Sequence, residues 1–81
     1  MEGIVAIING DQILLVEGLT SEGTKGLTEE ELIDESHGAA YLVLTEGNED
    51  VTVGDEVKVW IEALNTSHPA FGDASKVEVL P

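Results

Sequence analysis

Two apolar runs at the start of the chain predict a β-hairpin. The first, GIVAII (3–8), is apolar at nearly every position and rich in β-branched side chains, which is typical of a strand buried on both faces. Asn9-Gly10 follows, and this pair favours a tight hairpin turn because both residues tolerate positive φ. The run ILLVEG (13–18) is then expected to be the return strand.

A helical pattern begins after a polar, glycine-bearing loop at residues 20–26. Thr28 is placed to cap a helix, and Glu31, three residues later, can reach back to complete a capping box. Three glutamates (29–31) occupy the first turn, where the helix dipole favours negative charge. We expect a helix of about two turns, because His37-Gly38 provides a C-terminal stop.

Three further strands are expected in the second half of the chain. Residues 39–45 (AAYLVLT) form a mostly apolar run, whereas residues 56–63 (EVKVWIEA) and 76–80 (KVEVL) alternate between apolar and polar. Residues 65–73 (NTSHPAFGD) are interpreted as the connection between the last two strands. The residue before Pro69 favours extended backbone, which fits such a connection.

These elements predict a mainly β fold, a small five-stranded, OB-like, partly closed β-barrel with one short helix between the second and third strands. The 81 residues (1–81) are expected to form a single domain. Closure into a barrel is favoured because it removes exposed strand edges. The chain has no cysteine and is 42% hydrophobic, so an aliphatic core must hold the barrel together.

The charge of the chain disfavours two kinds of partner. The chain has seventeen acidic residues, three lysines and no arginine, which gives a formal net charge of −14. Nucleic-acid ligands are disfavoured because their binding needs lysine or arginine to displace counterions, and anionic membrane surfaces are disfavoured for the same reason. No segment reaches the length of a transmembrane helix, so no membrane insertion is expected. The acidic residues are interpreted as a solvated surface, with adaptation to high salt or divalent-cation binding as alternatives.

The most specific segments are VGDEVKVW (53–60) and SHPAFGDASKVEVL (67–80), which follow the opening hairpin and the acidic helix in order. With these segments in this order, the chain resembles the YobA-like domains of Bacillus and its relatives, a family of unknown function. The resemblance covers essentially the whole chain. It departs from the family pattern at His68, where tyrosine is usual, at Phe71, where glutamine is common, and in its acidity.

The resemblance implies a small β-barrel that is often the exported part of a lipoprotein. It implies no established activity, cofactor or catalytic residue, and no cofactor is predicted. If the chain is such a trimmed domain, it is expected outside the cytoplasm. Otherwise we expect a cytoplasmic protein, because no basic region precedes the apolar N-terminal run.

The serine, histidine and aspartate of residues 65–73 suggest a hydrolase at first sight. Ser67 and His68 are adjacent, however, and neighbours in extended chain point in opposite directions. No strained nucleophile elbow is present either. We therefore interpret this segment as a corner of the fold, and expect the protein to be non-enzymatic.

Aromatic side chains are the candidate ligand-binding residues. Trp60 is out of phase with the valines of its strand and Tyr41 with the leucines of its own, so both are expected on the outer surface, where they could stack on a base or sugar ring. Alternatively, the helix, or Pro69 and Phe71 together, cover Trp60, which is the expected arrangement in a barrel this small. The full candidate set is Trp60, Tyr41, His68 and Phe71.

Acidic residues around one turn are the candidate metal ligands, because calcium favours carboxylates on loops. The spacing matches no EF-hand loop, and a solvated acidic turn is the alternative. Two functions remain open: a binding module for a protein or saccharide partner, and an accessory acidic domain with loose divalent-cation binding. The candidate metal ligands are Glu46, Glu49, Asp50 and Asp55.

Overall fold

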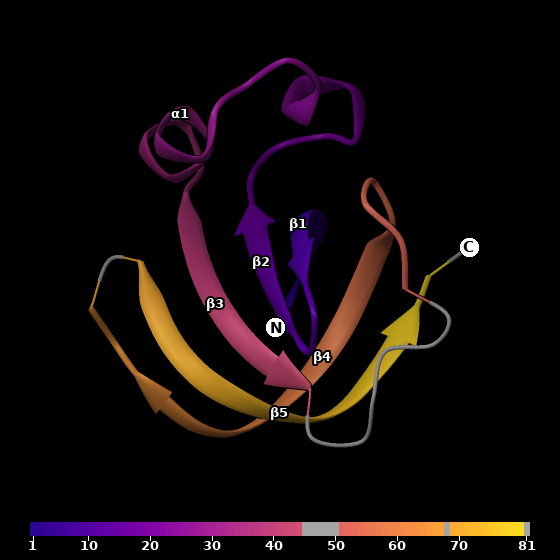
Figure 1. Ribbon diagram of the computed structural model, residues 1–81, viewed down its shortest axis with the longest axis vertical. Coiled ribbons are helices and arrows are strands. Elements are labelled where there is room, and N and C mark those ends of the chain that lie inside the picture. The colour runs from indigo at the N-terminus through magenta and orange to yellow at the C-terminus, as the bar shows by residue number, and fades with distance from the viewer. Residues whose placement is uncertain (45–50, 68, 81) are drawn as a thin grey trace.

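The computed structural model describes residues 1–44, 51–67 and 69–80. It is a closed barrel with strand order β1-β2-β3-β5-β4, with one α-helix beside it (Figure 1). This architecture confirms the predicted mainly β, five-stranded barrel with a short helix between the second and third strands. The elements are β1 (Glu2–Asn9), β2 (Gln12–Glu17), a short 3-10 turn η1 (Glu22–Thr24), α1 (Glu29–Glu35), β3 (Gly38–Leu44), β4 (Glu56–Asn65) and β5 (Ala70–Val79).

The barrel closes through one parallel pair of strands and four antiparallel pairs. β3 and β5 run parallel, from the pair Ala40–Ala70 to the pair Leu44–Ala74. β1 meets β4 on the other side of the barrel, where Val59 donates its backbone N–H to the carbonyl oxygen of Met1 at 2.6 Å. Segments that are distant in the sequence are therefore neighbours on the barrel surface.

Two apolar clusters stabilise the fold, one inside the barrel and one outside it. Val5 and Leu42 belong to the interior cluster, whereas Ile4 and Leu14 belong to the outer cluster that also contains Leu32 of α1. β1 contributes to both clusters, as predicted for a strand buried on both faces. The register of β1 shifts between Val5 and Ile7, which moves Ile7 to the outer side.

Helix α1 begins with the predicted capping box. The Thr28 hydroxyl accepts the backbone N–H of Glu31 at 3.2 Å, and the Glu31 carboxylate accepts the backbone N–H of Thr28 at 3.0 Å. The helix ends at Glu35, and the N–H of Ser36 bonds to the carbonyl oxygen of Leu32 at 3.2 Å. Among the described residues, no helix is both long enough and apolar enough to cross a membrane.

Strand β5 is longer than the sequence suggested. It starts at Ala70 rather than at residue 76, so the connection expected at residues 65–73 shrinks to 66–69. The sequence pattern did not predict a strand here because Gly72 lies within it, and glycine has a low β propensity. Glycine is required there, since a Cβ would collide with the carbonyl oxygen of Ala63 on β4.

Candidate functional site

One row of side chains crosses the outer surface of all five strands. Residues that face each other in a strand pair carry their side chains on the same side of the sheet. The strand register places Ile7 beside Leu14, Leu14 beside Tyr41, and Tyr41 beside Phe71. Asn65 on β4 completes the line opposite Phe71. We call these residues the aromatic row: Ile7, Leu14, Tyr41, Phe71 and Asn65.

A second row runs parallel to the aromatic row and is offset from it by two residues on every strand. Asn9 faces Gln12, Gln12 faces Val43, and Val43 faces Asp73. Ala63 on β4 lies opposite Asp73. We call these residues the polar row, because two amides and a carboxylate dominate it: Asn9, Gln12, Val43, Asp73 and Ala63.

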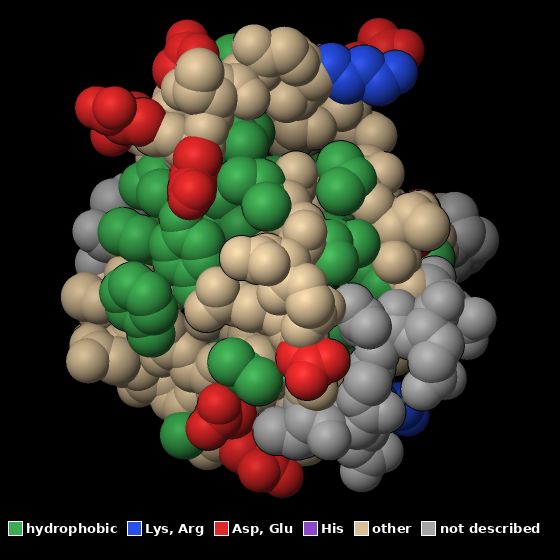
Figure 2. All heavy atoms as spheres, in the orientation of Figure 1, with side chains coloured by type: hydrophobic (Ala, Val, Ile, Leu, Met, Phe, Trp, Pro, Cys, Tyr) green, Lys and Arg blue, Asp and Glu red, His purple; other side chains and the backbone are tan. Residues whose placement is uncertain are grey.

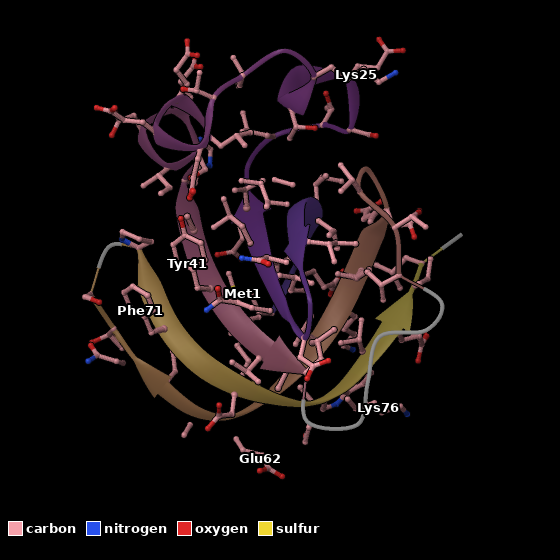
Figure 3. The ribbon with its side chains drawn as sticks, in the orientation of Figure 1. Met1, Lys25, Tyr41, Glu62, Phe71 and Lys76 are labelled. Atoms are coloured by element: carbon pink, nitrogen blue, oxygen red, sulfur yellow. The ribbon has the colours of Figure 1, made fainter. Side chains whose placement is uncertain are left out.

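Two aromatic rings stack at the centre of the aromatic row. The ring centroids of Tyr41 and Phe71 are 5.4 Å apart, and the ring planes differ by 20°. Phe71 remains 50% exposed. Both side chains lie on the same side of the barrel (Figure 3), where Figure 2 shows hydrophobic side chains gathered beneath a fringe of carboxylates. The pair forms an apolar surface that a ligand can contact.

Glu29, the first residue of α1, fixes the position of the Tyr41 side chain. The Tyr41 hydroxyl donates a hydrogen bond to Oε2 of Glu29 at 2.7 Å. Burial, and then the hydrogen bond and negative charge of Glu29, raise the pKa of Tyr41 to about 12. The phenol is therefore neutral at ordinary pH, and its ring is held between the helix and Phe71.

A shallow hollow of about 100 Å³ lies between the two rows and the start of α1. Small-molecule pockets typically measure about 300–1,000 Å³, so this hollow can hold only part of a larger ligand. Its amides and its carboxylate supply both donors and acceptors of hydrogen bonds. The lining residues are Ile7, Asn9, Gln12, Ile13, Leu14, Glu29 and Tyr41.

Trp60 lies elsewhere, on the outer surface of β4. It is 38% exposed, with Nζ of Lys76 4.8 Å and Nζ of Lys58 5.3 Å from its ring centroid. The outward orientation was predicted, but the expected cover by the helix, or by Pro69 and Phe71, is wrong. Lys76 is the cross-strand partner of Trp60, and Lys58 precedes it by two residues on the same strand, so the two ammonium groups meet at the indole. Trp60 is not part of the aromatic row.

One of the four candidate metal ligands, Asp55, lies within the described residues. Glu46, Glu49 and Asp50 lie outside the described residues, as does His68 of the ligand-binding set. The Asp55 carboxylate accepts the backbone N–H of Thr52 at 2.9 Å, a contact that stabilises the turn. Within residues 1–44, 51–67 and 69–80, no three histidine, cysteine or acidic side chains gather in a way that could hold a metal ion. Calcium binding stays a prediction.

Ser67 is engaged in the corner between β4 and β5. Its hydroxyl donates to the carbonyl oxygen of Pro69 at 2.9 Å, and its N–H bonds to Oδ1 of Asn65 at 3.2 Å. Both contacts are local turn interactions of the kind that short polar side chains make in loops. The geometry of Ser67 is that of a loop residue.

A larger polar hollow of about 490 Å³ separates the loop after β2 from the turn before β4. Lys25 and Asp55 are the charged residues that line it. No aromatic ring borders this hollow, and the described side chains around it form no cluster of possible metal ligands. The aromatic row is therefore the stronger candidate for ligand binding.

A family model described as "Protein of unknown function (DUF3221)" matches residues 2–81. The chain belongs to this family. The DUF3221 match spans all five strands and both rows described above. No curated protein matches the sequence.

Two solved structures share the fold of this DUF3221 domain. A crystal structure of a YobA protein from Bacillus subtilis is 23% identical, with a TM-score of 0.81 over 99% of this chain and 91% of that one. A solution structure of Bacillus subtilis YobA 21–120 is 22% identical, with a TM-score of 0.75 over 99% of this chain and 79% of that one. At this identity the similarity shows a common fold.

Sequence reasoning named the two stacked rings of the DUF3221 domain but missed their polar neighbours. The first hairpin turn lies at Gly10-Asp11, one residue later than the expected Asn9-Gly10, because Gly10 has positive φ and Asn9 does not. Asn9 therefore ends β1 and pairs with Gln12, which the expected turn would not have shown. The position of Asp73 was not predicted, because this residue lies in the first half of β5, which the sequence pattern missed. The contact of Glu29 with Tyr41 depends on where α1 lies against the barrel, and nothing in the local sequence signals that position.

Proposed function

We propose that this domain is a non-enzymatic binding module that holds a saccharide on the aromatic row. The observation that carries the proposal is the half-exposed Phe71 ring, stacked on Tyr41 beside the amides of the polar row. Ligand sites commonly combine an apolar or aromatic surface with a few polar groups that fix orientation. A sugar ring suits this combination, because it has an apolar face and a rim of hydroxyl groups.

The fold and the charge together favour a saccharide over the other partners. OB-type barrels commonly bind oligonucleotides and oligosaccharides on the face of their second and third strands, through which the aromatic row passes. A net charge of −14, with no lysine in either row, opposes binding of phosphate backbones. Protein interfaces bury about 800 Å² on each partner. A narrow line of rings bordered by amides suits a slender ligand better.

The test is a calorimetric titration with short soluble oligosaccharides that are neutral, N-acetylated, amino-substituted or acidic. At least one is expected to bind, and Phe71→Ala should weaken its binding about tenfold, which is the effect of losing a stacking contact. Val79→Ala is the matched control. Val79 is a 39% exposed residue of the same strand, but it pairs with Val57 at the far end of β5.

Two outcomes would contradict the proposal. In the first, none of the oligosaccharides binds the wild-type protein, which would direct the search to protein partners. In the second, Val79→Ala weakens binding as much as Phe71→Ala does. That result would mean that the aromatic row is not where the ligand binds.

A further inference from the structure

The aromatic row lies between two carboxylates. Glu29 stands at the edge formed by α1, hydrogen-bonded to the Tyr41 hydroxyl, and Asp73 lies beside Val43 in the polar row. Asp73 is one strand and two residues away from Tyr41, so its Cα is separated by about 4.8 Å across the sheet and about 6.6 Å along it. A short oligosaccharide that rests on Phe71 can reach both groups.

No positive charge balances these carboxylates. Lys58 and Lys76 are turned toward Trp60, and Lys25 lies in the loop after β2. In the described part of the chain, no lysine forms an ion pair with Glu29 or with Asp73. The electrostatic potential over the row is therefore negative, in the same sense as the net charge of the whole chain.

Both carboxylates keep oxygen atoms available for a ligand. Oε2 of Glu29 accepts the Tyr41 hydroxyl, whereas the capping box of α1 uses Glu31 and leaves Oε1 of Glu29 unused. Within the described residues, the Asp73 carboxylate accepts no hydrogen bond from the protein. A carboxylate that binds an ammonium group gains a charge-assisted hydrogen bond, which is stronger than a bond between neutral groups.

Resting on the saccharide-binding function proposed above, we propose that the ligand is an amino sugar, an oligosaccharide that carries protonated primary amines. Its ammonium groups bind the carboxylates of Glu29 and Asp73, while a sugar ring lies on Phe71. The amides of Asn9 and Gln12 bond to its hydroxyl groups. An acidic sugar would be repelled by the same carboxylates, and a neutral sugar would cover them without compensating their charge.

The experiment compares three probes of equal length and linkage by calorimetry: a glucosamine oligosaccharide, its fully N-acetylated form, and the glucose oligosaccharide. N-acetylation removes the positive charge and keeps the ring. We expect the glucosamine form to bind at least about tenfold more tightly than either of the others. Glu29→Gln and Asp73→Asn should each weaken its binding about tenfold, and should weaken binding of the N-acetylated form much less, because only the glucosamine form carries ammonium groups.

A chain of net charge −14 attracts any polycation, so two controls are needed. Glu78→Gln removes one negative charge outside both rows, opposite Lys58, and should leave binding unchanged. A short oligolysine with the same number of charges should bind more weakly than the glucosamine probe, and its binding should not respond to Phe71→Ala.

The possible failures can be distinguished. If the N-acetylated or glucose probe binds as tightly as the glucosamine probe, the amino-sugar inference is wrong and the saccharide module stands. If Glu78→Gln weakens binding as much as Glu29→Gln, or if oligolysine binds equally well, the attraction is nonspecific and the inference is again wrong. If no saccharide binds the wild type, both proposals fail.

Discussion

The ring of Phe71 lies against the ring of Tyr41, with their centroids 5.4 Å apart. The two residues come from β5 and β3, and the parallel pairing of these strands places them side by side. Tyr41 is in turn hydrogen-bonded to Glu29 on the helix. These two contacts join the last strand, the middle strand and the helix, and they give the outer surface an aromatic centre whose environment can be measured.

The ionisation of Tyr41 measures that environment directly. Tyr41 is the single tyrosine of the chain, so the absorbance of tyrosinate reports this residue alone. The titration midpoint is expected near pH 12 rather than 10, because burial and then Glu29 raise the pKa. Glu29→Gln should move the midpoint back toward 10, and Glu30→Gln, its neighbour on α1, should not.

The same shift predicts how stability depends on pH. The folded-state pKa lies above the unfolded value of 10, so the folded protein holds its proton more tightly. The stabilisation is fully present below pH 10 and is lost as the pH rises through about 12. Urea unfolding across this range should show a steeper loss for wild type than for Tyr41→Phe. Equal losses would mean that other groups cause the effect.

A substitution at Gly72 tests how closely β4 and β5 approach each other. Gly72→Ala puts a Cβ against the carbonyl oxygen of Ala63 and 3.1 Å from Cδ1 of Leu64. Because backbone must move to relieve this clash, we expect a loss of about 1–3 kcal/mol in the free energy of unfolding, measured with urea. Gly23→Ala is the control, since its Cβ meets only the Thr20 hydroxyl, at 3.1 Å. A similar loss in both variants would argue against the clash.

The hydrophobic pattern predicted the barrel because alternation and turn chemistry are local. Gly10 marked the first hairpin, although its turn is Gly10-Asp11 rather than Asn9-Gly10, and Thr28 with Glu31 marked the start of α1. The first half of β5 was missed because its strand character comes from pairing with two neighbours, which Gly72 permits but does not signal.

The candidate site was predicted only in part, for a related reason. Phase within a strand gave the outward orientation of Tyr41 and Trp60. It could not show which side chains of other strands lie beside them. The cross-strand register decides that Tyr41 meets Phe71 and that Trp60 meets Lys76, and this register depends on closure of the whole barrel.

The contacts of Trp60 with two lysines should stabilise the fold slightly. Lys76→Met and Lys58→Met are each expected to lower the free energy of unfolding by about 0.5–1 kcal/mol, the usual size of an exposed cation–π contact. Both changes also make the chain more acidic. Lys25→Met is the matched control for charge, and an equal loss in that variant would assign the effect to charge alone. Trp60 is the single tryptophan, so its fluorescence should also shift in the first two variants.

The acidic surface gives rise to two hypotheses that a melting experiment separates. If the carboxylates are simply solvated and repel one another, sodium chloride should raise the melting temperature by screening, and calcium at matched ionic strength should raise it equally. We expect this result, because Asp55 is engaged with Thr52 and the described residues hold no cluster of possible metal ligands.

An additional rise that is specific to calcium would instead support a cation site, since a ligand stabilises the state that it binds. That rise should disappear in Asp50→Asn and Glu49→Gln, the predicted ligands next to the turn. It should persist in Glu78→Gln, which removes the same charge from β5. A rise that all three variants retain would mean that calcium acts through the net charge, and would exclude a site at residues 46–55.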